Sequence, residues 1–399
     1  MRVFFNAIIV QIFLSAYIYW RGWQGLPDKN YVKIPYTTIY IVELIIYFMG
    51  FFLSSTGLLP FDALHDFAWI GTTWMIFAIY MTGLLLIYDL FKYIDRKKKI
   101  FPQSLDLKAK KPRLIYFCLS LLLVCGVMTY GNYKFRNPVV TEMDLSVKKD
   151  AGNLKSLRIV VATDIHAGYL IDKNMVSMYV DKIMEQKPDL ILLVGDIVDY
   201  DAKSLYEQRM ETEFLRLKAP YGVYVSTGNH EYIDIGEAKD EKILWLSEKA
   251  GLNVLRDTTI MIANSFYLVG REDDQCLARK PLGEIMVGVD ENYPVIVMNH
   301  EPHRLQEEVD AGADIAVYGH THNGQFFPNN TIMKLSSWIY NTGIVPEGMK
   351  MRFMYELPYG YKMKGNTHIF VSSGLGLAGP QYRIGTVSEI VVLNVNFNK

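Results

Sequence analysis

The sequence of 399 residues contains few cysteines and, in its first third, few acidic residues. Only three cysteines are present, and Cys276 alone follows residue 136, so the C-terminal part cannot hold an internal disulfide or a zinc site made of paired cysteines. Residues 1–136 carry 15 Lys and Arg against seven Asp and Glu, whereas residues 137–399 carry 26 against 35. The basic, apolar first part excludes a purely soluble protein. The acidic second part argues against nucleic acid as a partner.

Four apolar stretches are long enough to cross a bilayer core, which takes about 20 helical residues. They cover residues 3–20, 38–59, 68–90 and 114–130. We therefore predict an integral, multi-pass membrane protein of the plasma or inner membrane with about four spans in residues 1–133. Glu43 lies inside the second stretch, where an ionisable group is costly; it is either functional or paired near the interface.

The loops between the predicted spans differ in charge. Residues 92–113 contain nine Lys and Arg and residues 21–36 contain three, and both segments lie on the same side of a four-span bundle. Positively charged loops stay in the cytoplasm, so we expect the C-terminal domain to lie outside it.

The C-terminal part reads as one α/β domain over residues 155–399, preceded by a linker over residues 134–154. Short β-rich runs alternate with helical patterns at residues 173–186 and 240–250, which favours sheets covered by helices. The β-rich runs are residues 157–163, 190–194, 222–226, 259–269, 295–298, 315–318, 368–372 and 390–395.

Five of these runs end in unusual polar motifs: DxH, GDxxD, GNHE, NHxP and GHTH. Alternate residues of an extended segment point the same way, so we expect Asp164 and His166 to converge, and likewise His320 and His322. Imidazole and carboxylate groups suit divalent Mn, Fe, Co or Zn, and seven candidate ligands are too many for one tetrahedral ion. Two ions sharing one carboxylate fit the number, and Asp196 is short enough to bridge them.

These motifs, in this order, resemble the calcineurin-like metallophosphoesterase superfamily. The multi-span N-terminal part and the segment Ser372-Ser373-Gly374-Leu375-Gly376 are similar to its membrane-anchored, YkuE-type branch, which includes the transmembrane protein with metallophosphoesterase domain. The resemblance implies a two-sheet sandwich flanked by helices with a dinuclear metal site. It further implies a phosphoesterase that uses a metal-activated hydroxide to break a P–O bond.

The resemblance also implies roles for individual residues. Asp164, His166 and His322 would hold the first metal, Asn229, His300 and His320 the second, and Asp196 both. His230 would act on the substrate as the catalytic residue without binding metal. Glu231, Asp199 and Asn323 would support the site from behind; Asn323 stands where the branch often has glycine, and it tolerates a left-handed backbone.

An insertion over residues 328–365 follows the GHTH motif, so it should stand near the metals. It is either extra packing over the sheet or an apolar lip that meets the bilayer or a lipid tail, with Trp338 and Phe353 as the contacts. Its large side chains are Trp338, Tyr340, Met349, Met351, Phe353, Met354, Tyr355, Tyr359 and Tyr361.

The sequence thus predicts a membrane-anchored phosphodiesterase or pyrophosphatase that acts on a lipid-linked or membrane-proximal phosphate ester. One alternative is an enzyme similar to UDP-2,3-diacylglucosamine pyrophosphatase of lipid A synthesis, which works in the cytoplasm. A reporter fused after Lys399 would distinguish the two compartments. Another alternative is a transporter or sensor bundle regulated by the metal-binding domain, in which Glu43 would be essential.

Overall fold

The computed structural model describes residues 2–53, 59–102, 104–233, 240–346, 351, 353–377 and 379–398, with side chains from residue 8 to 49 in the first range. The chain divides into two compact units. One comprises residues 1–132 with 379–381, and the other comprises residues 133–378 with 382–399.

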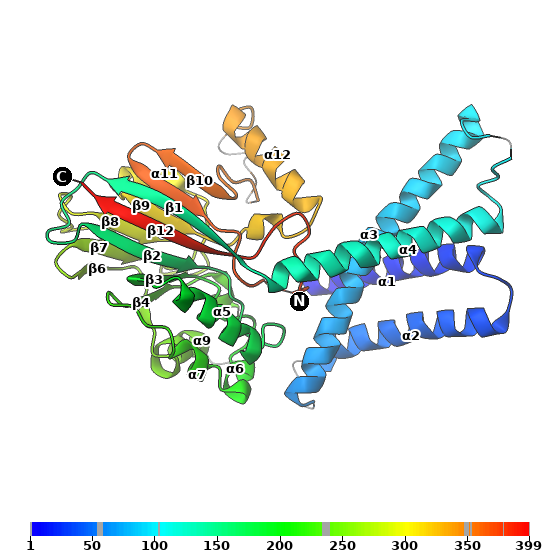
Figure 1. Ribbon diagram of the computed structural model, residues 1–399, viewed down its shortest axis with the longest axis horizontal. Helices are drawn as coiled ribbons and strands as arrows, with labels where there is room; N and C mark the ends of the chain where they lie inside the picture. The colour runs from blue at the N-terminus through cyan, green and yellow to red at the C-terminus, as the bar shows by residue number, and fades with distance from the viewer. Residues whose placement is uncertain are drawn as a thin grey trace. The chain divides into compact units, whose positions relative to one another are not determined.

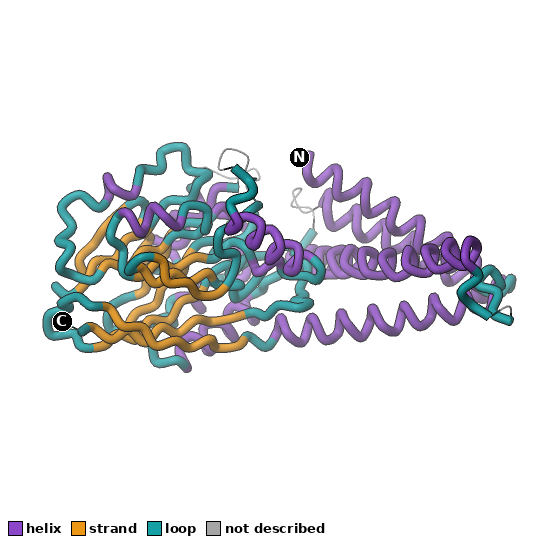
Figure 2. The backbone as a smooth tube through the Cα atoms, turned by 90° about the horizontal axis from the view of Figure 1, so that it is seen from above, coloured by secondary structure: helices purple, strands orange, loops and turns teal. Residues whose placement is uncertain are grey.

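Long helices make up the N-terminal unit (Figure 2). They are α1 (Arg2–Gly25), α2 (Asn30–Leu53), α3 (Phe61–Lys98) and α4 (Lys110–Arg136). Within the described residues, three segments are long and apolar enough to cross a membrane: Asn30–Met49, Phe61–Lys98 and Lys110–Arg136. The predicted span at residues 3–20 is helical but not among them, so a fourth span stays a prediction. Residues 54–58 of the second predicted span lie outside the described residues.

The two basic loops of this unit meet at one end. Asp28, between α1 and α2, forms an ion pair with Lys110 at the start of α4. Arg113 donates a hydrogen bond to Gln24 Oε1 at 3.4 Å. The loops therefore lie on the same side of the unit, as the charge argument assumes. On α2, the buried Oε2 of Glu43 has no hydrogen-bond partner in the described part of the chain, and its role stays a prediction.

Two six-stranded mixed sheets form the centre of the C-terminal unit (Figure 1). The first sheet has the order β1 (Val139–Val147), β12 (Glu389–Phe397), β2 (Ser156–Ala162), β3 (Leu190–Val194), β4 (Val223–Ser226) and β5 (Asn253–Leu255). The second has the order β10 (Gly360–Lys364), β11 (Thr367–Val371), β9 (Ile315–Tyr318), β8 (Val295–Met298), β7 (Phe266–Gly270) and β6 (Thr258–Ile262).

Both faces of each sheet are buried. In β2, Ile159 and Val161 pack between the two sheets, whereas Val160 and Ala162 pack against the outer helices. This is why the central strands read as continuous apolar runs rather than alternating ones. The first sheet is covered by α5 (Lys173–Glu185), α6 (Lys203–Gln208), α7 (Glu211–Phe214) and the π-helix η1 (Trp245–Lys249), and the second by α10 (Leu282–Ile285) and α11 (Leu305–Asp310).

The predicted linker is wrong in part, because it contains the edge strand β1, which pairs in parallel with β12. Only Leu145 and Val147 of β1 are fully buried, so its sequence carries a weak hydrophobic signal. The predicted strand over residues 259–269 is instead the hairpin of β6 and β7. Its turn runs through Ala263 and Asn264, both with φ of +50°, and alanine is not a residue that predicts such a turn.

The sequence-based prediction also lacks the short strands β5 and β10, and it gives one helix where the structure has two helical segments. The predicted helix over residues 240–250 is α9 (Glu241–Leu244), followed by the π-helix η1. The remaining predicted strands and the helix α5 are present with bounds that shift by no more than a few residues.

Candidate metal centre

The polar motifs follow strands that run parallel within each sheet. In the first sheet β2, β3 and β4 are parallel, and in the second β8 and β9 are parallel. Asp164, Asp196 and Asn229 follow the first three strands, and His300 and His320 follow the other two. Because parallel strands end at the same edge of a sheet, their side chains gather there into two adjoining clusters.

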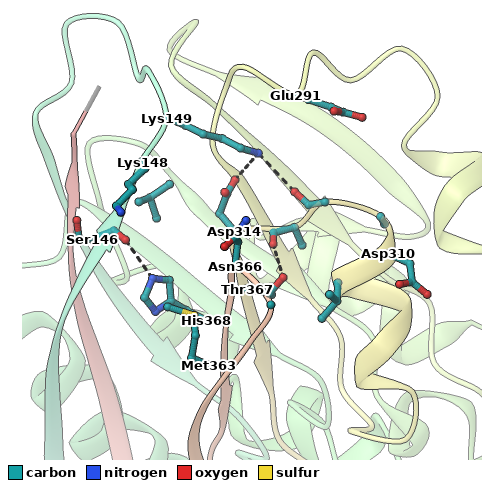
Figure 3. A pocket seen from close by; sticks show the side chains of 16 residues that line it. Ser146, Lys148, Lys149, Glu291, Asp310, Asp314, Met363, Asn366, Thr367 and His368 are labelled. Atoms are coloured by element: carbon teal, nitrogen blue, oxygen red, sulfur yellow. Dashed lines mark hydrogen bonds and ion pairs between the residues drawn. The ribbon is translucent and has the colours of Figure 1, made fainter.

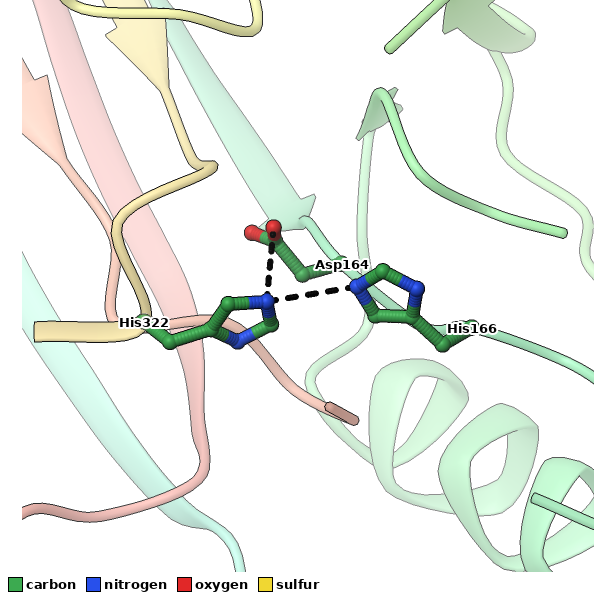
Figure 4. Close-up of side chains that lie close together, drawn as sticks. All are labelled: Asp164, His166 and His322. Carbon is green, nitrogen blue, oxygen red and sulfur yellow. Dashed lines mark hydrogen bonds and ion pairs between the residues drawn. The ribbon is translucent and has the colours of Figure 1, made fainter. Parts of the chain in front are cut away.

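The first cluster consists of Asp164, His166 and His322, whose ligand atoms lie within 4.8 Å of one another (Figure 4). His322 Nε2 lies 3.5 Å from Asp164 Oδ1 and 3.2 Å from His166 Nε2. Asp164 and His166 are buried. One carboxylate and two imidazoles turned toward a common point are a donor set that fits Mn, Fe, Co or Zn.

The second cluster consists of Asp196, His300 and His320, again with ligand atoms within 4.8 Å of one another. His300 Nε2 lies 3.1 Å from Asp196 Oδ2. Asn229 joins the cluster through its Oδ1, which is 2.8 Å from His320 Nδ1. This second donor set, with two imidazoles, a carboxylate and an amide oxygen, also fits a divalent ion.

Asp196 lies between the clusters. Its Oδ2 is 3.1 Å from His300 Nε2 in the second cluster and 3.8 Å from His166 Nε2 in the first. Its Oδ1 accepts a hydrogen bond of 2.8 Å from the main-chain N–H of His230. The carboxylate is 2% exposed, so its charge requires compensation from cations or donors inside the site.

The ligands converge for a reason that differs from the predicted one. The motif residues are not extended: φ is +54° at Asp164, +53° at His166, +70° at His320 and +49° at His322. These left-handed conformations reorient each side chain, so the alternation of a strand does not apply beyond its end. The expectation that His320 and His322 converge is therefore wrong, since they belong to different clusters.

His230 and Asp199 form a pair beside the first cluster. His230 Nδ1 lies 2.9 Å from Asp199 Oδ1, and His166 Nδ1 lies 3.5 Å from the same oxygen. Burial alone would lower the pKa of His230, but the carboxylates of Asp196 and Asp199 raise this pKa to about 9. The buried ammonium of Lys242 hydrogen-bonds the carbonyls of His230, Ile233 (2.6 Å) and Asp199 (3.3 Å), and so joins the two loops.

Glu231 supports two loops of the site through buried hydrogen bonds. The Glu231 carboxylate accepts hydrogen bonds from the main-chain N–H groups of Asp196, Ile197, Val198 and Gly228, at 2.7–3.0 Å. Glu231 thereby fixes the loop that carries Asp196 rather than the His230 ring. Asn323 has φ of +50°, the left-handed conformation that its residue type allows.

The insertion after the GHTH motif reaches the second cluster at one point. The Tyr355 ring stacks on His303 with 4.8 Å between centroids and lies 6.4 Å from the ring of His320. The insertion also contains the helix α12 (Asn329–Thr342), which exposes Trp338, and it exposes Phe353 farther along. Met349 lies outside the described residues.

Sequence reasoning gave no role to three charged residues of this region: Asp273, Lys242 and Arg383. Asp273 follows β7 at the same edge, is 1% exposed, and has its pKa raised to about 7 by burial and by the carboxylates of Glu301 and Asp196. A polar residue that follows a β-rich run is the same pattern that identifies the clustered ligands. It is not apparent here because β6 and β7 read as a single run over residues 259–269. Lys242 and Arg383 donate hydrogen bonds to main-chain carbonyls, and no motif predicts such contacts.

A pocket of about 670 Å³ lies elsewhere, where β1 ends and β11 begins (Figure 3). Lys149 forms an ion pair of 2.8 Å with Asp314 at its rim. His368 Nε2 lies 3.1 Å from the carbonyl oxygen of Ser146. None of the clustered ligands lines this pocket, so it is separate from the metal centre.

The comparisons with known proteins bear on these clusters. The family model described as calcineurin-like phosphoesterase matches residues 157–324, the range that contains all the clustered ligands. A metallophosphoesterase of Campylobacter jejuni, Cj0846, is 30% identical over 292 residues, which cover 72% of this chain and 71% of the relative. The chain belongs to the calcineurin-like metallophosphoesterase family.

Two further relatives are similar over most of this chain, and one of them is named as a transmembrane protein. The transmembrane protein with metallophosphoesterase domain of Bos taurus is 27% identical, over 71% of this chain and 62% of the relative. The metallophosphoesterase YkuE of Bacillus subtilis is 24% identical, over 68% of this chain and 93% of the relative. The predicted family is therefore confirmed, and this metallophosphoesterase is a hydrolase of phosphoester bonds. The chain spans less than two thirds of the bovine relative.

Proposed function

We propose that this metallophosphoesterase is a membrane-anchored, dinuclear phosphodiesterase or pyrophosphatase. The observation that carries the proposal is the position of Asp196 Oδ2, which lies within 3.8 Å of an imidazole nitrogen from each cluster. A carboxylate in that position is suited to two ions at once. A site for a single ion would need only one of the two donor sets, and Asp196 would then have no second ion to bind.

The clusters divide the ligands between two ions. Asp164, His166 and His322 would hold the first, Asn229, His300 and His320 the second, and Asp196 both. When bound, divalent ions would lower the pKa of water and neutralise the charge that develops on phosphorus oxygens. The identity of the ions, among Mn, Zn, Fe and Co, is not fixed by this donor set.

The His230–Asp199 pair supplies a proton. Asp199 orients the imidazole through Nδ1 at 2.9 Å, which leaves Nε2 for the oxygen of the leaving group. The Asp199 carboxylate beside Nδ1 favours the protonated ring, which is the form that donates. Lys242 holds the backbone on which both side chains stand.

Binding of manganese tests the dinuclear assignment. The purified full-length chain, stripped by chelator and titrated with Mn²⁺, is expected to bind two ions per chain with an exchange-coupled EPR signal. His322→Ala and His320→Ala should each leave one ion bound, because each removes a ligand from a different cluster. Binding of a single ion by the unmodified chain would contradict the dinuclear proposal.

We assign residues 1–133 to a membrane region of four spans and residues 155–399, together with β1, to the catalytic domain. The basic loops at one end of the helical unit support an extracytoplasmic position for that domain. Only Asn137 and Pro138 separate α4 from β1, so the connection between the membrane region and the catalytic domain is short.

A lipid-linked phosphate is the substrate class that the insertion favours. Seven large apolar side chains in the insertion or directly before it are more than half exposed: Phe327, Ile332, Leu335, Trp338, Ile344, Met351 and Phe353. Residues 326–346 contain no Asp or Glu, although the domain as a whole is acidic. An apolar surface whose segment over residues 326–346 lacks acidic residues suits contact with lipid tails beneath anionic headgroups.

Changing Trp338 and Phe353 together to Ser is expected to raise KM about tenfold for a dialkyl phosphodiester in vesicles. Burying a large apolar side chain in lipid contributes about 1.5–3 kcal/mol to the free energy of binding, and the serine substitutions remove part of this contribution. KM for water-soluble bis(p-nitrophenyl) phosphate should stay unchanged. Leu244→Ser with Val287→Ser, two exposed apolar residues elsewhere in the domain, should change neither KM. Equal effects on both substrates would contradict the lipid contact.

A further inference from the structure

A buried arginine lies behind the first cluster, and within the described part of the chain its hydrogen bonds go to main-chain oxygens. Arg383 is 0% exposed, and its Nη1 donates a hydrogen bond of 2.9 Å to the carbonyl of His322. Its Nη2 donates to the carbonyls of Gly374 (2.9 Å) and Gly376 (2.8 Å). None of the described carboxylates forms an ion pair with this guanidinium. A buried cation without a salt bridge is costly, so its three carbonyl contacts demand an explanation.

The three carbonyls belong to two loops that border the first cluster. One loop follows β9 and carries His322, and the other follows β11 and contains Gly374 and Gly376. The guanidinium is a rigid, planar fork whose donors have fixed directions. With one nitrogen bonded to each loop, it sets the distance between them.

The second loop is in turn joined to Asp164. Gly376 donates its N–H to the Asp164 carbonyl at 2.9 Å, and Leu375 donates to the Thr163 carbonyl at 2.9 Å. Gly374 has φ of +83°, and a Cβ there would lie 2.9 Å from Asp164 Cβ and 3.2 Å from His322 Nδ1. Arg383 is therefore linked through main-chain contacts to both Asp164 and His322.

The backbone conformation of His322 and Asn323 also has to be held in place by neighbouring groups. His322 and Asn323 have φ of +49° and +50°, conformations that L residues rarely adopt and that persist only where the surroundings hold them. The His322 carbonyl is held by Arg383 and by the N–H of Gln325 at 3.0 Å. Without Arg383, nothing but Gln325 would restrain that carbonyl among its described contacts.

We propose that Arg383 is a positioning residue for the first metal site: it fixes the spacing between the His322 loop and the loop that closes over Asp164. Arg383 donates no hydrogen bond to Asn229, His300 or His320, although the N–H of His320 bonds Asp164 Oδ1 at 3.0 Å. Arg383 should therefore govern the affinity of one metal site and spare the other. This inference rests on the proposed dinuclear function.

Metal titration of the full-length chain in detergent tests the proposal. Arg383→Met is expected to weaken binding of one Mn²⁺ at least about tenfold, the loss typical of residues that support metal ligands, and to leave the other affinity unchanged. At one equivalent of Mn²⁺, its EPR spectrum should match that of His322→Ala and differ from that of His320→Ala. Arg383→Lys keeps the charge and can bond one carbonyl, so it should recover part of the affinity.

Arg271 provides the matched control, because it is 1% exposed and bonds Glu307 and the carbonyl of Lys280, away from the ligands. Arg271→Met should lower the melting temperature of the metal-free protein without changing either Mn²⁺ affinity. Two unchanged affinities in Arg383→Met, or equal loss at both sites, would overturn the proposal; if that variant does not fold, the same criteria apply to Arg383→Lys. An unmodified chain that binds fewer than two ions would overturn the proposed function, and this inference with it.

Discussion

Replacing Asp196 by Asn is expected to lower kcat/KM for phosphodiester hydrolysis by at least roughly 1000-fold while the chain stays folded. Metal ions contribute several kcal/mol to transition-state stabilisation, and each 1.36 kcal/mol corresponds to about a factor of ten in rate. Asparagine keeps the shape of the side chain and its Oδ1 can still accept the N–H of His230. The substitution removes a charge that lies between the two clusters.

The measurement is hydrolysis of bis(p-nitrophenyl) phosphate by the full-length protein with saturating Mn²⁺, beside metal content and melting temperature. Excess chelator should abolish the activity of the unmodified chain to the same extent. Asp314→Asn is the matched control: this carboxylate is also buried and accepts a main-chain hydrogen bond, from Val295 at 2.8 Å, but lies outside the clusters. Near-normal activity in a folded Asp196→Asn variant, or in chelator, would refute the role assigned to Asp196.

The site was easier to predict than the fold that holds it, for a physical reason. Asp164, Asp196, Asn229, His300 and His320 each follow a buried strand, and this placement is visible in sequence because both the apolar run and the polar motif are short and local. Their grouping into two clusters depends instead on the order of strands in two sheets. Strand order is set by contacts far apart in sequence, which periodicity does not encode.

Each wrong prediction has its own physical cause. The edge strand β1 resembles a linker in sequence because one face of it is exposed, and only alternate residues near its end are buried. The hairpin of β6 and β7 resembles one strand because its turn uses Ala263 and Asn264 in left-handed conformations. The contacts of Arg383 and Lys242 are not predictable, since the carbonyls that these cations bond lie elsewhere in the sequence.

Substitution of His230 by Asn should reveal the proton donor through its dependence on the leaving group. General acid catalysis contributes roughly 100- to 10,000-fold, so kcat for a phosphodiester with an alkyl leaving group should fall by about that factor. A p-nitrophenolate leaving group departs as a stable anion and needs little protonation, so its hydrolysis should fall far less. Asp199→Asn should show the same pattern in weaker form, because Asp199 only orients the imidazole, at 2.9 Å.

His368 offers a control for loss of a buried imidazole. It is 7% exposed, with Nδ1 2.9 Å from the Tyr361 hydroxyl and Nε2 3.1 Å from the Ser146 carbonyl, outside both clusters. His368→Asn should lower stability and leave the ratio of rates for the two leaving groups unchanged. If His230→Asn slowed both substrates by the same factor, the ring would be binding phosphate rather than donating a proton, because charge stabilisation acts on phosphorus oxygens that the two substrates share.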